Sequence, residues 1–395
     1  MQSIFRVFFL FISIMLFISC QPENNGVPAT NIILNTKDIS VEKGEEVSLS
    51  VTFIPSNSRK DNLTWISLDS SIATVKKGVV TGIEPGTTEI VVKCGELADT
   101  CKVTVVILST AISFYTKQLT LTQGDSRTLI VNVEPSNSTE QIMWESSNEG
   151  VATVNQGVVR GVAEGVTTIT AKAGPLRTEC NVKVAVLKAV DLGLSVKWAD
   201  MNIGASSPED HGDYYAWGEI EPYYYSLDPI IWKEEKPDGY SWGSYKWANG
   251  SAFSITKYGL KIDGWEGAAP PDNNTELDPD DDVASVISGG KWRMPTLSEQ
   301  DELRTKCTWV WTTKNGVNGC EVTSKRNGNS IFIPTTGGIV RKFYGEVDLH
   351  GDYWSSTLDE FLNRKAYALV FKEGDVGWGP SDRCDGRPIR PVTKQ

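Results

Sequence analysis

A dense group of aromatic residues lies between positions 214 and 247, and aromatic rings are the side chains that stack on the C–H faces of sugars. Neighbouring Asp, Glu and Asn side chains can bind sugar hydroxyls. The rings that sit among Gly, Pro and Ser, where exposure is expected, are Tyr223, Tyr224, Tyr225, Trp242 and Trp247. We predict that these five bind the ligand, against the alternative that most rings of the group build the core of a loop-rich domain.

A run of carboxylates offers a second kind of chemistry. Asp280, Asp281 and Asp282 carry oxygen ligands of the type that calcium prefers, so calcium is the one cofactor that the sequence leaves open. The competing interpretation is that one or two of these residues cap a helix that begins there.

Catalysis is not expected. The chain holds only two histidines, His211 and His350, and neither accompanies a nucleophile motif. Cys307 and Cys320 are the candidate reactive thiols, but nothing around them in the sequence favours a lowered thiol pKa. The net charge of −12 repels phosphate backbones, which argues against nucleic-acid binding.

The N-terminus has the pattern of a secretory signal. Arg6 precedes an apolar run, residues 7–18, which is too short to span a bilayer as a helix. Residues 16–20 (Leu-Phe-Ile-Ser-Cys) resemble a bacterial lipobox. The resemblance implies that Cys20 is the lipid attachment site and that the membrane is contacted through this anchor alone. A plain secretory signal with an incidental cysteine is the alternative.

Two consecutive segments of the chain repeat each other with a shift of 79 or 80 residues. The repeated motifs are Pro55-Ser56-Asn57-Ser58 with Pro135-Ser136-Asn137-Ser138, Trp65 with Trp144, Ala73-Thr74-Val75 with Ala152-Thr153-Val154, and Gly78-Val79-Val80 with Gly157-Val158-Val159. Apolar and polar residues alternate within each copy, as in strands with one buried face, and Gly and Pro separate the strands at intervals typical of a sandwich. The motifs resemble the bacterial immunoglobulin-like (Ig-like) group 2 domain, which implies spacer or adhesive modules outside the membrane. We interpret Trp65 and Trp144 as core residues.

Cys94 and Cys101 lie at the ends of two alternating runs that should form a hairpin around Gly95. A register that pairs Val92 with Val103 would place the two cysteines opposite each other and allow a disulfide. The second copy has Ala173 and Cys180 at these positions, so a thiol in this place can also stand alone.

Residues 188–395 have a different character, rich in Trp, Tyr and Gly, with little regular alternation. A capping box at Thr296 and Glu299 predicts a helix to about Lys306, and a shorter helix is expected from Asp281 or Asp282 to Gly289. Strands are expected at 330–334, 366–371 and 387–392. These elements predict an α+β domain.

Five motifs of this segment carry a second resemblance. They are Val190-Asp191-Leu192-Gly193-Leu194-Ser195-Val196-Lys197-Trp198-Ala199, Gly212-Asp213-Tyr214-Tyr215-Ala216-Trp217-Gly218-Glu219, Gly290-Lys291-Trp292-Arg293-Met294-Pro295-Thr296, Tyr353-Trp354-Ser355-Ser356-Thr357 and Arg387-Pro388-Ile389-Arg390-Pro391-Val392. In this order they resemble the Fibrobacter succinogenes major paralogous domain of Bacteroidetes surface lipoproteins. The resemblance implies a fold like that of C-type lectins or of sulfatase-modifying factors, without specifying an activity.

The sequence therefore predicts a multidomain protein: two all-β Ig-like sandwiches followed by an α+β domain that is C-type-lectin-like. The expected boundaries are a signal peptide at 1–19, a tether at 20–28, Ig-like domains at 29–107 and 108–187, and a recognition domain at 188–395. We expect an outer-membrane lipoprotein of the cell envelope, exposed at the cell surface, that binds an extracellular glycan or a host or bacterial surface protein. A structural component of a surface assembly and a cryptic enzyme of the sulfatase-modifying-factor-like fold stay open as alternatives.

Overall fold

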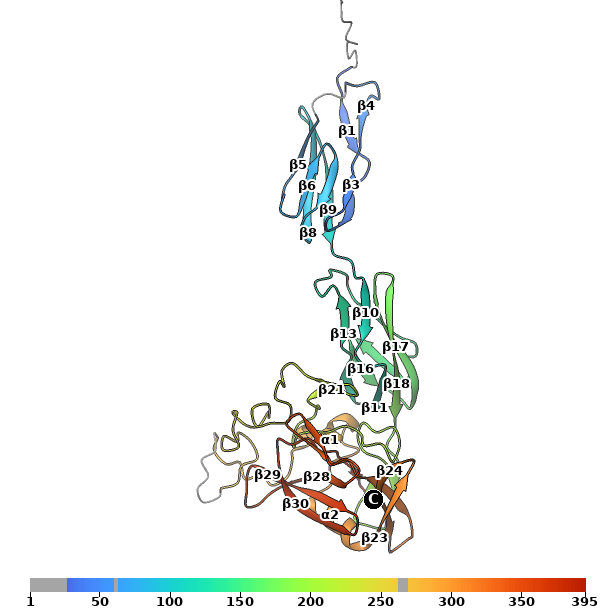
Figure 1. Cartoon of the computed structure of the whole chain (residues 1–395), viewed down its shortest axis with the longest axis vertical. Coiled ribbons are helices and arrows are strands. Elements are labelled where there is room, and N and C mark those ends of the chain that lie inside the picture. Colours follow the sequence, from blue (N-terminus) through green and yellow to red (C-terminus); the bar gives the residue numbers. More distant parts are fainter. Residues whose placement is uncertain (1–26, 60–62, 262–268) are drawn as a thin grey trace, which may run out of the picture. The chain divides into compact units, whose positions relative to one another are not determined.

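The computed structural model describes residues 27–59, 63–261 and 269–395 (Figure 1). The predicted signal peptide and Cys20 lie outside the described residues. Among the helices of this described part, none is long and apolar enough to cross a membrane. The chain divides into two compact units at residues 108 and 109, which we describe in turn.

The first unit is a β-sandwich. Its strands are β1 (Asn31–Leu34), β2 (Asp38–Glu42), β3 (Glu46–Ser48), β4 (Val51–Ile54), β5 (Leu63–Ser67), β6 (Ala73–Lys76), β7 (Val79–Gly82), β8 (Gly86–Cys94) and β9 (Leu97–Val106). One sheet has the order β2-β9-β8-β5, with β2 parallel to β9, and β3-β7-β6 and β1-β4 form the opposite layer. Alternating residues of β8 and β9 fill the core between the layers. Trp65 packs against this core, as predicted.

The hairpin of β8 and β9 has a different register from the one predicted. Cys94 pairs with Leu97 across a two-residue turn, and Cys101 pairs with Ile90. Cys101 therefore lies four residues along the ladder from Cys94, about 13 Å at 3.3 Å per residue, whereas a disulfide needs Cα atoms within about 7 Å. The predicted Cys94–Cys101 disulfide is wrong because a tight turn at Gly95 shifts the register.

The second unit begins with another sandwich of the same plan. Its strands are β10 (Ala111–Phe114), β11 (Gln118–Thr122), β12 (Ser126–Thr128), β13 (Val131–Glu134), β14 (Met143–Ser146), β15 (Ala152–Asn155), β16 (Val158–Gly161), β17 (Gly165–Ala173) and β18 (Leu176–Ala185). The sheet β11-β18-β17-β14 faces β12-β16-β15 and β10-β13. Trp144 packs on Phe114 with 5.7 Å between ring centroids, again in the core.

The rest of the second unit is β-rich and has long loops. Its elements are β19 (Ala189–Val190), β20 (Lys197–Ala199), β21 (Tyr224–Leu227), β22 (Ile230–Trp232), the 3-10 turn η1 (Pro279–Asp281), α1 (Val283–Ser288), α2 (Leu297–Lys306), β23 (Cys307–Lys314), β24 (Val317–Ser324), β25 (Ser330–Pro334), β26 (Gly338–Val340), β27 (Phe343–Gly345), β28 (His350–Leu358), β29 (Lys365–Lys372), β30 (Asp375–Asp382) and β31 (Val392–Thr393). The main sheets are β23-β24-β25 and β28-β29-β30. Loops connect them and carry much of the core.

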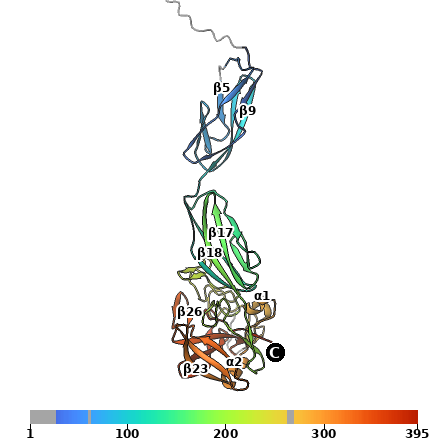
Figure 2. The same ribbon diagram turned by 90° about the vertical axis from the view of Figure 1, so that its right-hand side faces the viewer.

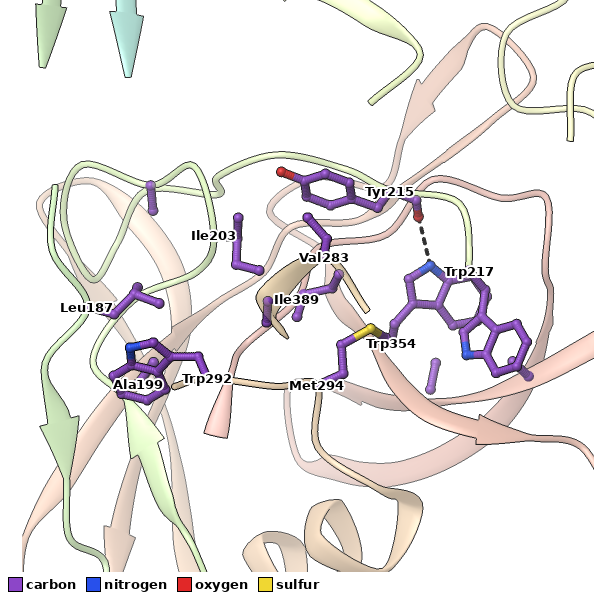
Figure 3. Packing of buried hydrophobic residues seen from close by; sticks show 14 of the residues in the cluster. Leu187, Ala199, Ile203, Tyr215, Trp217, Val283, Trp292, Met294, Trp354 and Ile389 are labelled. Carbon is purple, nitrogen blue, oxygen red and sulfur yellow. Dashed lines mark hydrogen bonds between the residues drawn. The ribbon is translucent and has the colours of Figure 1, made fainter. Parts of the chain in front are cut away.

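Figure 3 shows the centre of this C-terminal domain, where rings and aliphatic side chains from distant segments meet. The buried Trp354 donates from its indole nitrogen to the Tyr215 carbonyl at 2.8 Å, and Trp217 donates to the Ser355 carbonyl. Buried indole N–H groups need such partners. Ala185 at the end of β18 and Leu187 just after it belong to this cluster, whereas the second sandwich has a core cluster of its own. Figure 2 shows β18 leading toward the C-terminal domain.

Both predicted helices are present, but the α+β prediction for this domain overstated the share of helix. Thr296 and Glu299 form the capping box of α2, and Asp282 caps α1, which ends at the left-handed Gly289. These helices are short beside the strands, so the domain is β-rich. Strands formed near 330–334 and 366–371, whereas 387–392 is mostly an irregular segment, in part because Pro388 and Pro391 have no N–H to donate.

Candidate functional site

A cleft of about 780 Å³ opens on the C-terminal domain. Three segments surround it: the loop 238–243 with the segment 250–252, the hairpin of β26 and β27, and the chain that leaves β30. The lining residues are Asp238, Tyr240, Ser241, Trp242, Gly243, Gly250, Ser251, Ala252, Val340, Arg341, Lys342, Asp382, Cys384 and Asp385. The cleft thus combines one indole with hydroxyls, carboxylates and two cationic side chains.

Backbone hydrogen bonds fix the walls of the cleft relative to each other. Tyr240 and Arg341 exchange two bonds of 2.9 and 2.8 Å, which join the loop to the hairpin. Ile339 and Gly386 exchange two more at 2.8 Å, which join the hairpin to the segment after β30. A Cβ on Gly386 would lie 2.8 Å from the Tyr240 ring, so only glycine allows this approach. Backbone hydrogen bonds therefore fix the positions of the three segments that form the cleft.

Trp242 is the predicted site residue that the structure places in the cleft. It is half-buried, and its ring meets Tyr245 edge to face with 5.6 Å between centroids. Tyr245 is itself fixed, because its hydroxyl donates to the Trp217 carbonyl at 2.6 Å. Tyr245 thereby contacts one side of the Trp242 ring, and Trp242 still lines the cleft.

Asp385, one of the residues that line the cleft, belongs to a buried group of charges. The Arg387 guanidinium lies between two carboxylates, 3.1 Å from Asp352 and 3.3 Å from Asp385. Burial raises the pKa of Asp385 to about 7, although the positive charge of Arg387 opposes this shift. Burial likewise raises the pKa of Asp352. The single positive charge of Arg387 is thus shared by two carboxylates. With a pKa of about 7, Asp385 gains or loses its proton near neutral pH.

The prediction of exposure was wrong for Tyr223 and Tyr224, which are both buried. Tyr223 stacks on Tyr240 with 4.4 Å between centroids, and its hydroxyl donates to Glu219. Tyr224 accepts a hydrogen bond from the Tyr214 N–H at 2.9 Å. Their hydroxyls find partners inside the domain, which makes burial of the rings favourable and leaves no open face for a ligand.

The other two predicted aromatic residues lie outside the cleft. Trp247 is half-buried, donates to the Gly218 carbonyl at 2.9 Å and packs against the core beneath Lys246. Its role is in packing. Tyr225 is half-buried on β21 and lines a different groove. The structure therefore does not bring the five predicted residues together.

The predicted calcium ligands are not assembled either. Asp281 accepts hydrogen bonds of 2.6 Å from both Lys257 and Tyr258. Burial acts to raise its pKa, but these hydrogen bonds outweigh it and lower the pKa. Asp282 caps α1, and Asp280 is exposed. Asp281 is thus paired with Lys257, and Asp282 serves as a helix cap, which was the competing interpretation of the sequence. Within residues 27–59, 63–261 and 269–395, no three His, Cys, Asp or Glu residues are grouped to hold a metal.

The thiols considered for catalysis are buried in the sheet β23-β24-β25. Burial raises the pKa of Cys307 to about 11 and that of Cys320 to about 12, which is the opposite of an activated thiol. Cys307 pairs across the ladder with Ser324 and Cys320 with Trp311, so the two are not cross-strand partners.

The residues that sequence reasoning missed are Arg341, Asp382 and Asp385, which share the cleft with Trp242. Arg341 has a positive φ of 55° in the turn between β26 and β27, a conformation with no clear local signal in the sequence. Asp385 becomes part of the cleft only because Gly386 pairs with Ile339. These residues meet through pairing between distant segments, which spacing along the chain does not reveal.

Comparison with known proteins identifies the N-terminal part. Residues 28–105 and 109–182 match the bacterial Ig-like domain (group 2) family. An Ig-like virion protein of Serratia phage KSP90 is 27% identical over 176 residues, covering 41% of this chain and 67% of the phage protein. The predicted tandem of Ig-like domains is thus confirmed.

Among solved structures, domains 4 and 5 of the S-layer protein SbsC are 23% identical, with a TM-score of 0.19, and cover 40% of this chain and 100% of theirs. The titin Ig tandem A164–A165 is 10% identical, with a TM-score of 0.22, and covers 39% of this chain and 96% of its own.

Proposed function

We propose that this chain is a recognition protein of the bacterial cell surface, in which the C-terminal domain binds an extracellular glycan in the cleft around Trp242. In this proposal Cys20 is the lipid attachment site in the outer membrane, and the Ig-like domains act as spacers. The C-terminal domain belongs to the C-type-lectin-like group that its motifs resemble. A protein partner on a host or bacterial surface is the alternative ligand.

The composition of the cleft is the observation that carries the proposal. Trp242 offers an indole held in place by Tyr245, and a ring in this position can stack on a pyranose. Ser241, Ser251 and Asp238 line the same cleft and supply hydroxyl and carboxylate oxygens for sugar hydroxyls. An aromatic face beside several hydrogen-bonding groups is the arrangement that a sugar requires.

Two features support a surface role. Ig-like domains of this family match residues 28–105 and 109–182, and the phage relative is by its name a virion protein. The net charge of −12 disfavours nucleic acid as a ligand.

A protein ligand is favoured by one observation. Phe253 and Phe343 directly follow lining segments of the cleft, and each is 72% exposed. Exposed aromatic side chains of this size are enriched where proteins bind proteins. A glycan array tests the proposal, because only a glycan ligand, and not a protein ligand, gives binding on it.

The array is probed with the full chain, with and without a chelator of divalent cations. We expect binding to a restricted set of glycans that persists in the chelator, since the described carboxylates form no metal site. A folded protein that binds no glycan would overturn the glycan proposal and move the assignment to a protein partner.

A further inference from the structure

A second cavity lies where the second Ig-like domain meets the C-terminal domain. This groove has a volume of about 580 Å³ and takes its lining from both domains. The Ig-like domain contributes residues 115–120, which lead into and form β11, together with Arg127. The C-terminal domain contributes Gly204, Asp210, Asp213 and residues 224–229. Neither domain alone forms both walls.

The two walls are held in a fixed relation by a buried ion-pair network that we call the Arg127 latch. Arg127 of β12 contacts Asp125 at 2.7 Å in its own domain and Asp213 at 2.8 Å in the C-terminal domain. It also donates to the Tyr215 hydroxyl at 2.7 Å. The backbone N–H of Gly204 donates to the Thr122 hydroxyl at 2.8 Å nearby. The groove therefore lies within one compact unit, and these contacts hold its two walls together.

Two groove residues of the second Ig-like domain differ from their equivalents in the first, so the Ig-like fold itself does not require them. With the shift of 80 residues, Arg127 corresponds to Val47 and Tyr115 corresponds to Asn35. Arg127 differs from Val47 because it forms the latch to the C-terminal domain. Asn35 in the first copy has a local role, because its side-chain oxygen accepts a hydrogen bond from the Ser50 N–H at 2.8 Å. Tyr115 instead lines the groove with 48% of its surface exposed.

Tyr115 shares the groove with Tyr225 of β21, so each wall carries an aromatic residue that is at least partly accessible. Hydrogen-bonding side chains fill the lining around them: Thr116, Lys117, Gln118, Thr120, Asp210, Ser226 and Asp228. Two aromatic rings amid hydroxyl, amide and carboxylate groups suit a chain of sugar units, as in the cleft around Trp242.

The charges of the groove select among glycans. The charge of Arg127 is balanced by Asp125 and Asp213, and the other charged residues of the lining are Lys117, Asp210 and Asp228. A negatively charged sugar would meet excess carboxylate here. We propose that this groove is a second binding site, for a neutral oligosaccharide, formed jointly by the second Ig-like domain and the C-terminal domain. This proposal rests on the glycan-binding function proposed above.

The test measures the affinity of the full chain for neutral oligosaccharides from the array, using Tyr115→Asn and Tyr225→Ala. Tyr115→Asn installs the residue that the first copy carries, so the Ig-like fold tolerates it. We expect each variant to weaken binding about tenfold through loss of ring stacking, with an unchanged melting temperature. Phe361→Ala is the matched control, because Phe361 is 70% exposed and lines neither cavity.

The Trp242→Ala variant separates this proposal from the first one. Unchanged affinity in both tyrosine variants, with loss in Trp242→Ala, would overturn the groove and leave the cleft as the site. Loss in the tyrosine variants alone would support the groove and overturn the cleft. A folded chain that binds no neutral oligosaccharide would overturn both.

Discussion

At the scale of single residues, the structure divides the aromatic group into packing residues and binding candidates. Tyr223 and Tyr224 are buried with partners for their hydroxyls, whereas Trp242 lines the cleft. The sequence predicts an aromatic group but not which rings are exposed, since Tyr223 is buried by stacking on Tyr240 of another loop. Tyr115, by contrast, could have been found from the repeats, where Asn35 occupies the same position.

Asp385 provides a test of the buried group of charges to which it belongs. Its pKa is raised from 3.8 to about 7 by burial, so the folded protein keeps a proton that the unfolded chain releases near pH 4. The folded state binds more protons in this window, and stability falls as pH rises through it. We expect Asp385→Asn to remove this loss, so that its melting temperature relative to the wild type rises from pH 5 to pH 8.

Asp375→Asn is the control for this measurement, because Asp375 is exposed at the turn between β29 and β30. A difference between Asp385→Asn and wild type that stays constant with pH would contradict the raised pKa.

At the scale of elements, local signals predicted what local interactions determine. The capping box of α2 and the Asp282 cap and C-cap glycine of α1 placed the two helices correctly, because caps act within a few residues. The sequence did not predict β26 and β27, which form part of the cleft, pair with each other and bridge to Gly386, far along the chain. The hairpin β23–β24 was missed for another reason, since its strands lack strict alternation of buried and exposed residues.

The capping box of α2 has a measurable contribution. Thr296 accepts from the Glu299 N–H, and Glu299 accepts from the Thr296 N–H at 2.9 Å. We expect Thr296→Ala to lower the free energy of unfolding by about 1 kcal/mol. Ser298→Ala, at an exposed position of the same helix, should leave it nearly unchanged. Equal effects of the two substitutions in urea unfolding would show that the cap contributes nothing.

At the scale of the whole molecule, the second Ig-like domain is more than a spacer. Ala185 and Leu187 at its C-terminal end pack into the core of the C-terminal domain, and the Arg127 latch joins the two domains. The repeat pattern predicted two similar sandwiches correctly, but it does not show that the second copy is coupled to the next domain. The replacement of Val47 by Arg127 is the sequence difference that carries this coupling.

Two equivalent glycines test the coupling. Gly44 and Gly124 occupy the same repeat position with φ of 88° and 91°, so alanine costs about 1–2 kcal/mol in backbone strain at either. A Cβ on Gly44 meets nothing within 4 Å, whereas one on Gly124 would lie 1.9 Å from the Ile287 carbonyl oxygen of α1.

We therefore expect Gly124→Ala to destabilise the C-terminal domain in thermal unfolding more than Gly44→Ala does, and to increase protease cleavage near residue 187. Equal destabilisation by the two variants would contradict a tight junction.

The central claim is that the C-terminal domain binds a glycan through Trp242. Titration calorimetry of the strongest array glycan into the full chain tests it most directly, with Trp242→Ala compared with Trp378→Ala. Trp378 is 48% exposed on β30 and lines neither the cleft nor the groove, so it controls for loss of an exposed indole. We predict a loss of affinity of about tenfold or more for Trp242→Ala and none for Trp378→Ala. Unchanged affinity of a folded Trp242→Ala variant would contradict the claim.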